Sequence, residues 1–414
     1  MPLTPEQLAK ISQKEASLPD ALKRNTLTNY REGYFFITLN TRDYAPILSI
    51  IIGHPHAPDG TPHAPRCQYT QLGRRVLEVW QTIPQYHPYT EIIAAEAMPD
   101  HFHGLLRLKP GNRKHLGHII GSYMGACTHA YWDMLGIDWR KDREERRAKG
   151  AAALPPDRDR DHTRSLRGPS LFVRGYNDME AITPEQLRIK LQYIHEQARR
   201  ALIKGTLRDR FHIHRSCTAH GWTLDALRHA FLADRHLAHD PSRLEATLRT
   251  LMPRIHMQPA AAPTPLLSYI GSYALLAAPR KLSLICHRSD APFFHLQRDA
   301  VLRAARGGAV IVSAFISPRE REIMKLLLTE RLPIIEVVDN GFADRHKPTG
   351  KSFYACAENR LVQISPWNYE YHRHNTVTRE MCLVMNQLVR VIAGVEDGWW
   401  KEEGKGKNEK SNGF

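Results

Sequence analysis

Apolar and polar positions alternate over residues 101–108, His-Phe-His-Gly-Leu-Leu-Arg-Leu, and this period of two predicts a β-strand. Successive side chains of a strand point to opposite faces of a sheet, so His101 and His103 share one face. Residues on the other face are Phe102, Gly104, Leu106 and Leu108. The pattern therefore predicts two imidazoles about 6–7 Å apart along one side of a sheet.

A helical period follows much later, from Thr183 to Gly205. Thr183 as N-cap, Pro184 at the first helical position and Gln186 three residues after the cap mark its start. The apolar residues spaced to face a core are Leu187, Leu191, Ile194 and Ala198.

Lys190, Tyr193 and Gln197 follow one flank of this predicted helix. Tyr193 and Gln197 are four residues apart, so they lie one above the other on adjacent turns. An edge made of a lysine, a tyrosine and an amide suits a core poorly. It suits a nucleophile beside a metal ion.

The first part of the chain has the pattern of one domain over residues 1–205. A strand at 34–40, a helix at 70–82 and an extended segment at 89–97 precede the histidine strand. This order predicts an α+β domain with an antiparallel sheet, of ferredoxin-like or RRM-like type.

The second part has a different pattern. Residues 206–262 are rich in His, Arg and Ala, and we interpret them as a helical connector. Strands and helices then alternate over 263–400, which predicts an α/β Rossmann-like domain with a doubly wound parallel sheet. The polar residues 401–414 predict a disordered tail.

The net charge of the chain indicates which class of binding partner to expect. Among 414 residues, 58 Lys and Arg stand against 43 Asp and Glu, giving a net charge of +15. This surplus favours a polyanionic partner, first of all nucleic acid. No run of about 18 apolar residues and no signal peptide is present, so we expect a cytoplasmic, nucleoid-associated protein. The six scattered cysteines predict free thiols.

Two of these segments carry a family resemblance. Met98-Pro99-Asp100-His101-Phe102-His103 resembles the Met-Pro-Asn-His-x-His segment of single-tyrosine HUH transposases, in particular the REP-associated tyrosine (IS200-like) transposases. Tyr193-Ile194-His195-Glu196-Gln197 is similar to their Tyr-x-x-x-Gln element. The resemblance covers roughly residues 30–205. It departs at Asp100, where relatives have Asn, at Met124, where Lys is common, and in a polar insertion near 140–168.

The resemblance implies a site and a chemistry. His101, His103 and Gln197 would hold a divalent ion, Mg²⁺ or Mn²⁺, which acts as Lewis acid and template. Tyr193 would be the nucleophile that forms a covalent phosphotyrosine. Lys190 and Arg107 are the predicted DNA contacts.

Other uses of these residues can be compared with the sequence. A cupin-type oxygenase needs a Glu shortly after His-x-His, and the next Glu is Glu144. A structural zinc site would need closely spaced cysteines, which the sequence lacks. A histidine pair that only solvates a sheet face stays open. The competing nucleophiles are Tyr123, Tyr131 and Tyr176.

The C-terminal alternation resembles the Rossmann-like domain of DprA-like DNA-processing proteins. The matching stretches are Ile270-Gly271-Ser272, Ser313-Ala314-Phe315-Ile316-Ser317-Pro318 with Glu320, and Ile364-Ser365-Pro366-Trp367. The resemblance implies binding of single-stranded DNA or a nucleotide at the carboxyl ends of the strands, or dimerisation. A nucleotide-cleaving activity would need a Pro-Gly-Gly-x-Gly-Thr loop, which is absent.

The sequence thus predicts a metal-dependent transposase or nickase that recognises a DNA hairpin and cuts single-stranded DNA through Tyr193. Two alternatives remain: a domesticated DNA-binding protein that recognises hairpins without transposing, and a nucleotide- or single-stranded-DNA-sensing protein that acts through its C-terminal domain. Whether the chain forms a homodimer is left open.

Overall fold

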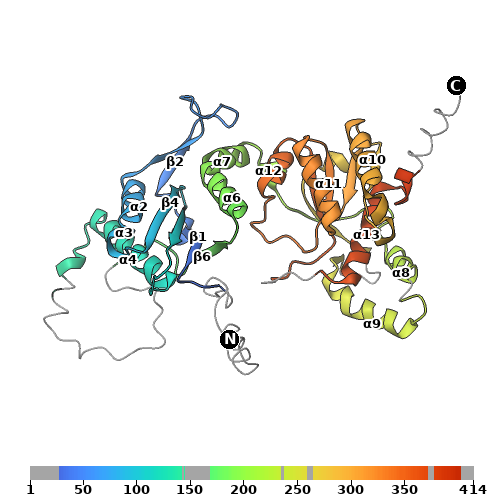
Figure 1. The fold of residues 1–414 in the computed structure, drawn as a ribbon, viewed down its shortest axis with the longest axis horizontal. Coiled ribbons are helices and arrows are strands. Elements are labelled where there is room, and N and C mark those ends of the chain that lie inside the picture. Colours follow the sequence, from blue (N-terminus) through green and yellow to red (C-terminus); the bar gives the residue numbers. More distant parts are fainter. Residues whose placement is uncertain are drawn as a thin grey trace. The chain divides into compact units, whose positions relative to one another are not determined.

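The structure, a computed structural model, describes residues 28–141, 144, 168–234, 237–258, 264–371 and 377–401. It divides into two compact units, residues 1–203 and 204–414 (Figure 1). The predicted insertion near 140–168 and the predicted tail lie almost wholly outside the described residues. Each unit has its own sheet and its own core, which agrees with the predicted mixture of helices and sheets.

The first unit is built on a four-stranded antiparallel sheet of order β4-β5-β1-β6. In that order the strands are Thr90–Ala97, His101–Leu108, Gly33–Asn40 and Asn177–Ala181. The predicted histidine strand is β5, between β4 and β1. A hairpin of β2 (Ser49–Ile52) and β3 (Arg66–Tyr69) lies outside this sheet.

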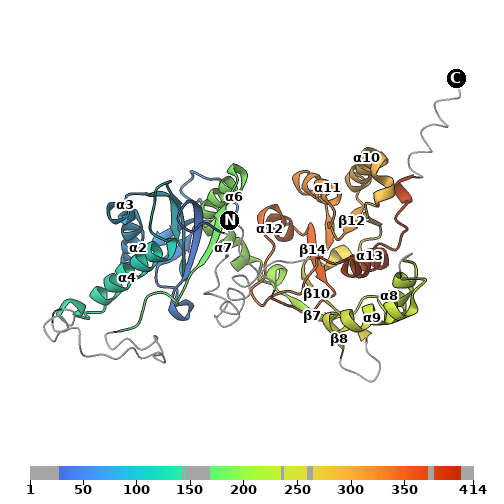
Figure 2. The same cartoon turned by 60° about the horizontal axis from the view of Figure 1, so that its bottom comes forward.

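The two faces of this sheet carry different layers (Figures 1 and 2). Helices α2 (Gln71–Gln81) and α4 (Leu116–Met134) cover the face of Phe102 and Leu106 and complete the main core. Helix α6 (Pro184–His195) covers the face of His101 and His103, where Ile194 packs on Phe36 and Leu105. The predicted division of the β5 side chains between two faces is therefore confirmed.

Trp80 lies so close to Gly104 that a side chain at residue 104 should lower the stability of the first unit. A Cβ at Gly104 would lie 2.4 Å from Trp80 Cζ2, and both groups are buried. We therefore expect Gly104→Ala to lower the free energy of unfolding by about 1–3 kcal/mol or more, because the core cannot take the methyl group without shifting. In the control, Gly121→Ala on α4, a Cβ would meet nothing within 4 Å, and thermal unfolding should show unchanged or higher stability. Equal stability of the two variants would contradict this packing.

The predicted helix 183–205 is present but bends at Glu196. It forms α6 and α7 (Gln197–Thr206), with the predicted capping box of Thr183 and Gln186 at its start. The backbone hydrogen bonds Glu196 N to Gln192 O and Arg200 N to Glu196 O continue across the bend. Tyr193 and Gln197 consequently lie on either side of the bend.

The second unit contains a six-stranded sheet of order β11-β12-β13-β14-β10-β7. Strands β11 to β14 are parallel, while β10 and β7 are antiparallel additions. The sheet is therefore mixed and not the wholly parallel sheet that the alternation of strands and helices predicts. In sheet order the strands are Lys281–Ser283, Val310–Ser313, Ile334–Val337, Leu361–Ser365, Leu267–Gly271 and His214–Cys217. A two-stranded β8–β9 pair, Met257–Gln258 with Thr264–Pro265, lies apart.

Helices lie on both faces of this second sheet (Figure 2). One layer holds α10 (Phe294–Arg306), α11 (Pro318–Thr329) and α12 (Gly350–Ala357). The other holds α13 (Arg379–Ala393) with α8 (Leu224–Leu232) and α9 (Pro241–Leu251), which share one core with the sheet.

The predicted helical connector 206–262 needs correction. It is not a separate segment, because its β7 pairs with β10 and its α8 and α9 bury Leu227, Phe231 and Leu248 in the core of the second unit. Both helices pack on α13. No described helix combines the length and the apolar character needed to cross a membrane.

Candidate active site

His101 and His103 form the centre of the candidate site. Their ring centroids lie 4.7 Å apart, with the rings at 76°. The side chain of His101 is 24% exposed, whereas His103 is buried. The pair therefore has one member at the surface and one anchored in the interior.

Each imidazole has a partner at Nδ1. His101 Nδ1 lies 2.6 Å from Asp100 Oδ1, and His103 Nδ1 lies 3.0 Å from Thr38 Oγ1 on β1. Such hydrogen bonds fix the ring orientation and, where Nδ1 carries the proton, assign metal coordination to Nε2.

Tyr193 projects from α6 onto this pair. Its ring centroid lies 5.5 Å from that of His103 and 5.8 Å from that of Phe36, both in edge-to-face geometry. The Arg200 guanidinium lies 5.4 Å from the Tyr193 ring centroid, and its Nε donates to Glu196 Oε2 at 3.0 Å. The tyrosine is half-buried and held on three sides.

Gln197, one turn after Tyr193, is buried. Its Nε2 is a buried polar atom without a hydrogen-bond partner among the described residues. The oxygen and nitrogen of an amide can exchange places, so Oε1 can take this position. Within the described part of the chain, no group of three His, Cys, Asp or Glu side chains could hold a metal ion.

The two predicted DNA contacts lie in different places. Lys190 Nζ is 5.1 Å from the ring centroid of Phe36 and 3.2 Å from Met179 Sδ, next to the site, and burial lowers its pKa. Arg107 is on the same face of β5, four residues past His103, or roughly 13 Å along the strand. It lies 3.8 Å from Glu91 and is not part of the site.

The structure places three further residues here that no motif in the sequence indicates: Thr38, Arg200 and Glu96. Glu96 on β4 is opposite His103, and its Oε1 accepts a hydrogen bond from the Tyr69 hydroxyl at 2.7 Å. Burial and this carboxylate raise the pKa of Tyr69. Strand register places Thr38 and Glu96 here, and the packing of α7 places Arg200, and a single sequence contains neither kind of information.

The competing tyrosines lie elsewhere. Tyr123 is buried against the opposite face of the sheet, where its hydroxyl donates to Val76 O and burial raises its pKa. Tyr131 and Tyr176 pack at the same core. Tyr193 is therefore the tyrosine that the fold brings to the histidine pair.

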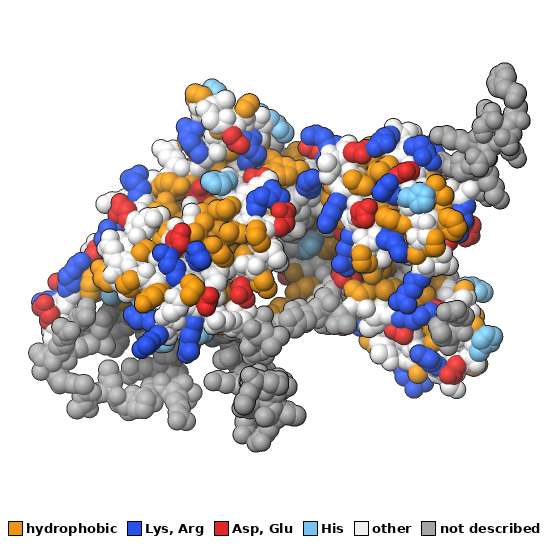
Figure 3. All heavy atoms as spheres, viewed as in Figure 1, with side chains coloured by type: hydrophobic (Ala, Val, Ile, Leu, Met, Phe, Trp, Pro, Cys, Tyr) orange, Lys and Arg blue, Asp and Glu red, His pale blue; other side chains and the backbone are white. Residues whose placement is uncertain are grey.

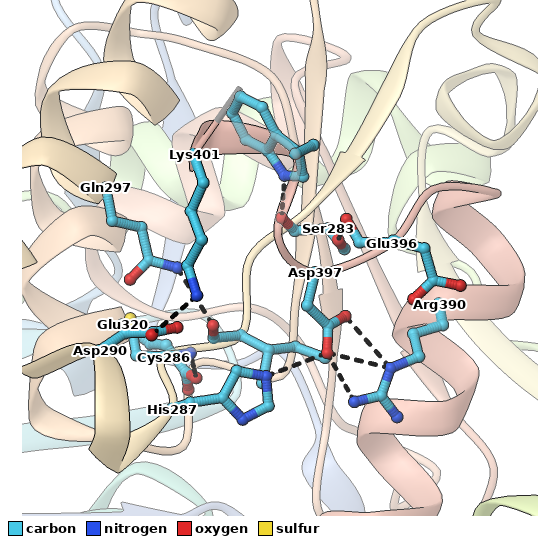
Figure 4. A network of polar contacts seen from close by, with 12 residues as sticks. Ser283, Cys286, His287, Asp290, Gln297, Glu320, Arg390, Glu396, Asp397 and Lys401 are labelled. Carbon is cyan, nitrogen blue, oxygen red and sulfur yellow. Dashed lines mark hydrogen bonds and ion pairs between the residues drawn. The ribbon is translucent and has the colours of Figure 1, made fainter. Parts of the chain in front are cut away.

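In the second unit, residues 396–401 dock on the loop after β11 (Figure 4). Asp397 accepts hydrogen bonds from Arg390 and lies 3.1 Å from His287 Nε2. Burial would raise the pKa of Asp397, but these hydrogen bonds more than offset it and lower the pKa. Two further contacts are Lys401 with Asp290 at 2.9 Å and Trp399 Nε1 with Ser283 O at 2.7 Å. This corner of the sheet is filled by the chain itself.

Comparison with known proteins gives partial likenesses. No family model matches the chain. An uncharacterised protein of Haemophilus influenzae is 30% identical over 81 residues, which span 19% of this chain and 39% of that relative. The match thus covers well under half of the relative's length.

Three solved structures are similar to parts of the chain. A REP-associated tyrosine transposase bound to a REP hairpin has a TM-score of 0.25 and 13% identity, over 42% of this chain and 72% of that one. A candidate transposase from Deinococcus radiodurans R1 has a TM-score of 0.23 and 14% identity, over 42% and 98%. DNA processing protein A from Helicobacter pylori, described for its single-stranded DNA binding, has a TM-score of 0.24 and 20% identity, over 33% and 60%.

Proposed function

We propose that the first unit is a ferredoxin- or RRM-like HUH domain that cuts and rejoins single-stranded DNA through a phosphotyrosine on Tyr193. The observation that carries the proposal is the edge-to-face contact between Tyr193 and His103, beside His101. Tyr193 and the two histidines are more than 80 residues apart in the sequence, and only the fold brings them together. The net charge of +15 supports a nucleic-acid substrate.

The donor set fits a divalent cation. His101, His103 and Gln197 would hold it, with the Gln197 amide turned so that its Oε1 faces the ion. Mixed nitrogen and oxygen donors suit Mn²⁺ and, with water ligands, Mg²⁺. When bound, the ion would neutralise charge on the phosphoryl oxygens.

The residues of the chain supply the remaining chemistry. The Tyr193 oxygen forms a bond to phosphorus while the bond from phosphorus to one sugar oxygen breaks. The phenol loses its proton, and the departing sugar oxygen gains one, so a free hydroxyl end and a phosphotyrosine result. Because one phosphate ester replaces another, attack by a hydroxyl end reverses the step and rejoins DNA. Contacts with Phe36 and Arg200 orient the ring for this attack.

The test is a cleavage assay on single-stranded oligonucleotides that carry a hairpin, with Mn²⁺ and a label on either end. We expect one labelled end to remain attached to the denatured protein. Hairpin binding without any covalent product would instead support a domesticated DNA-binding protein. Binding that depends only on residues 204–414 would support the sensing role of the second unit.

From the Asp100–His101 hydrogen bond we predict that two substitutions of Asp100 weaken Mn²⁺ binding to different extents. Asp100→Ala removes the outer partner of His101 and should weaken Mn²⁺ binding about 10- to 100-fold in calorimetric titration. Asp100→Asn keeps an acceptor for the Nδ1–H but removes the charge, so its loss should be smaller.

The control for this series is Asp133→Asn, which removes an exposed carboxylate on α4 that pairs with Arg140. Its Mn²⁺ affinity should equal that of the wild type. An unchanged affinity in Asp100→Ala would contradict the metal assignment of His101.

A further inference from the structure

Basic side chains do not gather in one patch on the face drawn in Figure 3, where they are interspersed with acidic ones. A nucleic-acid site must therefore be identified from local chemistry. Two adjoining cavities of the first unit have such chemistry. They measure about 530 and 350 Å³ and share Tyr86, His87 and Lys114 as lining residues.

Two tyrosines are exposed at these cavities. Tyr86, the last residue of α3 (Ile83–Tyr86), is 72% exposed, and Tyr89, just before β4, is 50% exposed. Neither side chain makes a hydrogen bond or ring contact within the part of the chain that the structure describes. Gly111 approaches the Tyr89 ring so closely that a Cβ there would lie 3.4 Å from Cε1. Gly111 therefore lies beside this ring.

Positive charge borders the same cavities. Arg113 is exposed and has no ion-pair partner among the described residues, and Lys114 Nζ lies 3.4 Å from His87 Nδ1. Burial and the Lys114 ammonium lower the pKa of His87, so the ring is neutral at pH 7 and adds an acceptor. The loop is held in place by Asn112, whose side chain bonds Arg31 O, Lys114 O and Lys114 N.

We propose that these cavities bind unpaired nucleotides of a single DNA strand, with bases stacked on Tyr86 and Tyr89 and the backbone phosphates against Arg113 and Lys114. Exposed aromatic rings beside unpaired cations are the combination that binds single strands, because every unpaired base offers a face for stacking. A duplex buries those faces inside its own stack. The volumes lie in the range of ligand-binding pockets.

This site is separate from the candidate active site. β5 begins at His101 and ends at Leu108, where it pairs with Thr90 beside Tyr89, so the two sites are roughly 24 Å apart along the strand. A strand that reaches both would be held at two points. The proposal rests on the proposed function only for the identity of the DNA, since stacking here needs no cleavage.

Binding is measured in a Tyr193→Phe background, so that a failure of the proposed catalysis does not affect the result. The probe is a fluorescein-labelled 20-nucleotide single strand of mixed sequence, followed by anisotropy. Tyr86→Ala and Tyr89→Ala should each weaken binding about 5- to 100-fold. Tyr86→Phe keeps the stacking ring and should keep wild-type affinity. Arg113→Gln should make the salt dependence shallower by about 0.7 in log–log slope, whereas Arg75→Gln, on α2 and paired with Glu78, should not.

A 5-iododeoxyuridine strand should also photocrosslink to the peptide that contains residues 86–89. Unchanged affinity in the folded Tyr86→Ala/Tyr89→Ala double variant would overturn the proposal. So would equal losses of single-strand and duplex binding. If the double variant loses only self-association in size-exclusion chromatography, the surface is a protein contact and the proposal is wrong.

Discussion

Tyr193→Phe should abolish the covalent protein–DNA product and lower strand cleavage by about 10⁴-fold or more, because it removes the oxygen that we propose bonds to phosphorus. The ring contacts with His103, Phe36 and Arg200 do not involve the hydroxyl oxygen, so packing is kept. Hairpin affinity and the thermal midpoint of unfolding should therefore equal those of the wild type. Denaturing electrophoresis measures the adduct, and mass spectrometry of the wild-type product locates the modified peptide.

Tyr131→Phe is the matched control, since it deletes a phenol of the same unit that lies on the other face of the sheet. This variant should form the adduct at the wild-type rate. An adduct on Tyr123, Tyr131 or Tyr176, or normal cleavage by Tyr193→Phe, would contradict both the assignment of the nucleophile and the family resemblance.

His103→Ala should remove Mn²⁺ binding and metal-dependent cleavage, and His101→Ala should do the same. Loss of a direct ligand should exceed the roughly 100-fold loss typical of an outer partner. Hairpin binding should persist, because phosphate contacts by Lys and Arg supply most of the affinity for nucleic acids. Calorimetric titration with Mn²⁺ and cleavage across a range of metal concentrations measure the two effects separately.

His103 is buried and bonded to Thr38, so its removal also affects packing. Circular dichroism and thermal unfolding of His103→Ala separate the loss of packing from the loss of metal binding. His101→Ala alters a more exposed ring, so it repeats the test with less effect on packing. His118→Ala, on the exposed side of α4, is the control that should bind Mn²⁺ normally. Wild-type cleavage by both histidine variants would contradict the metal site.

Local patterns were sufficient to predict β5 and the helix that carries Tyr193. The alternation over residues 101–108 reports directly on the two faces of a strand, and the capping box of Thr183 and Gln186 marks a helix start within four residues. Both signals are short-range. They depend on the backbone geometry of one element and not on its neighbours.

The other features of the fold and of the site depend on contacts between segments that are distant in the sequence. Thr38 meets His103 because β1 and β5 pair in one register across 65 residues, and nothing in either segment specifies that register alone. The place of residues 206–262 in the second unit depends on distant contacts in the same way. The apolar residues of α8 and α9 give no sign of their partner, α13, which lies more than 120 residues further along the chain.

The docking of residues 396–401 has a consequence for synthesis of the chain. Trp399 Nε1 donates a hydrogen bond to Ser283 O, which lies 116 residues earlier in the chain. At usual translation rates, Trp399 is therefore synthesised about 6 to 23 s after β11. The carbonyl of Ser283 and the carboxylate of Asp290 stay uncovered on the ribosome during that time. The first unit, whose sheet closes by Ala181, can finish folding while the second is still being made. Chaperone demand during translation should therefore be concentrated on the second unit.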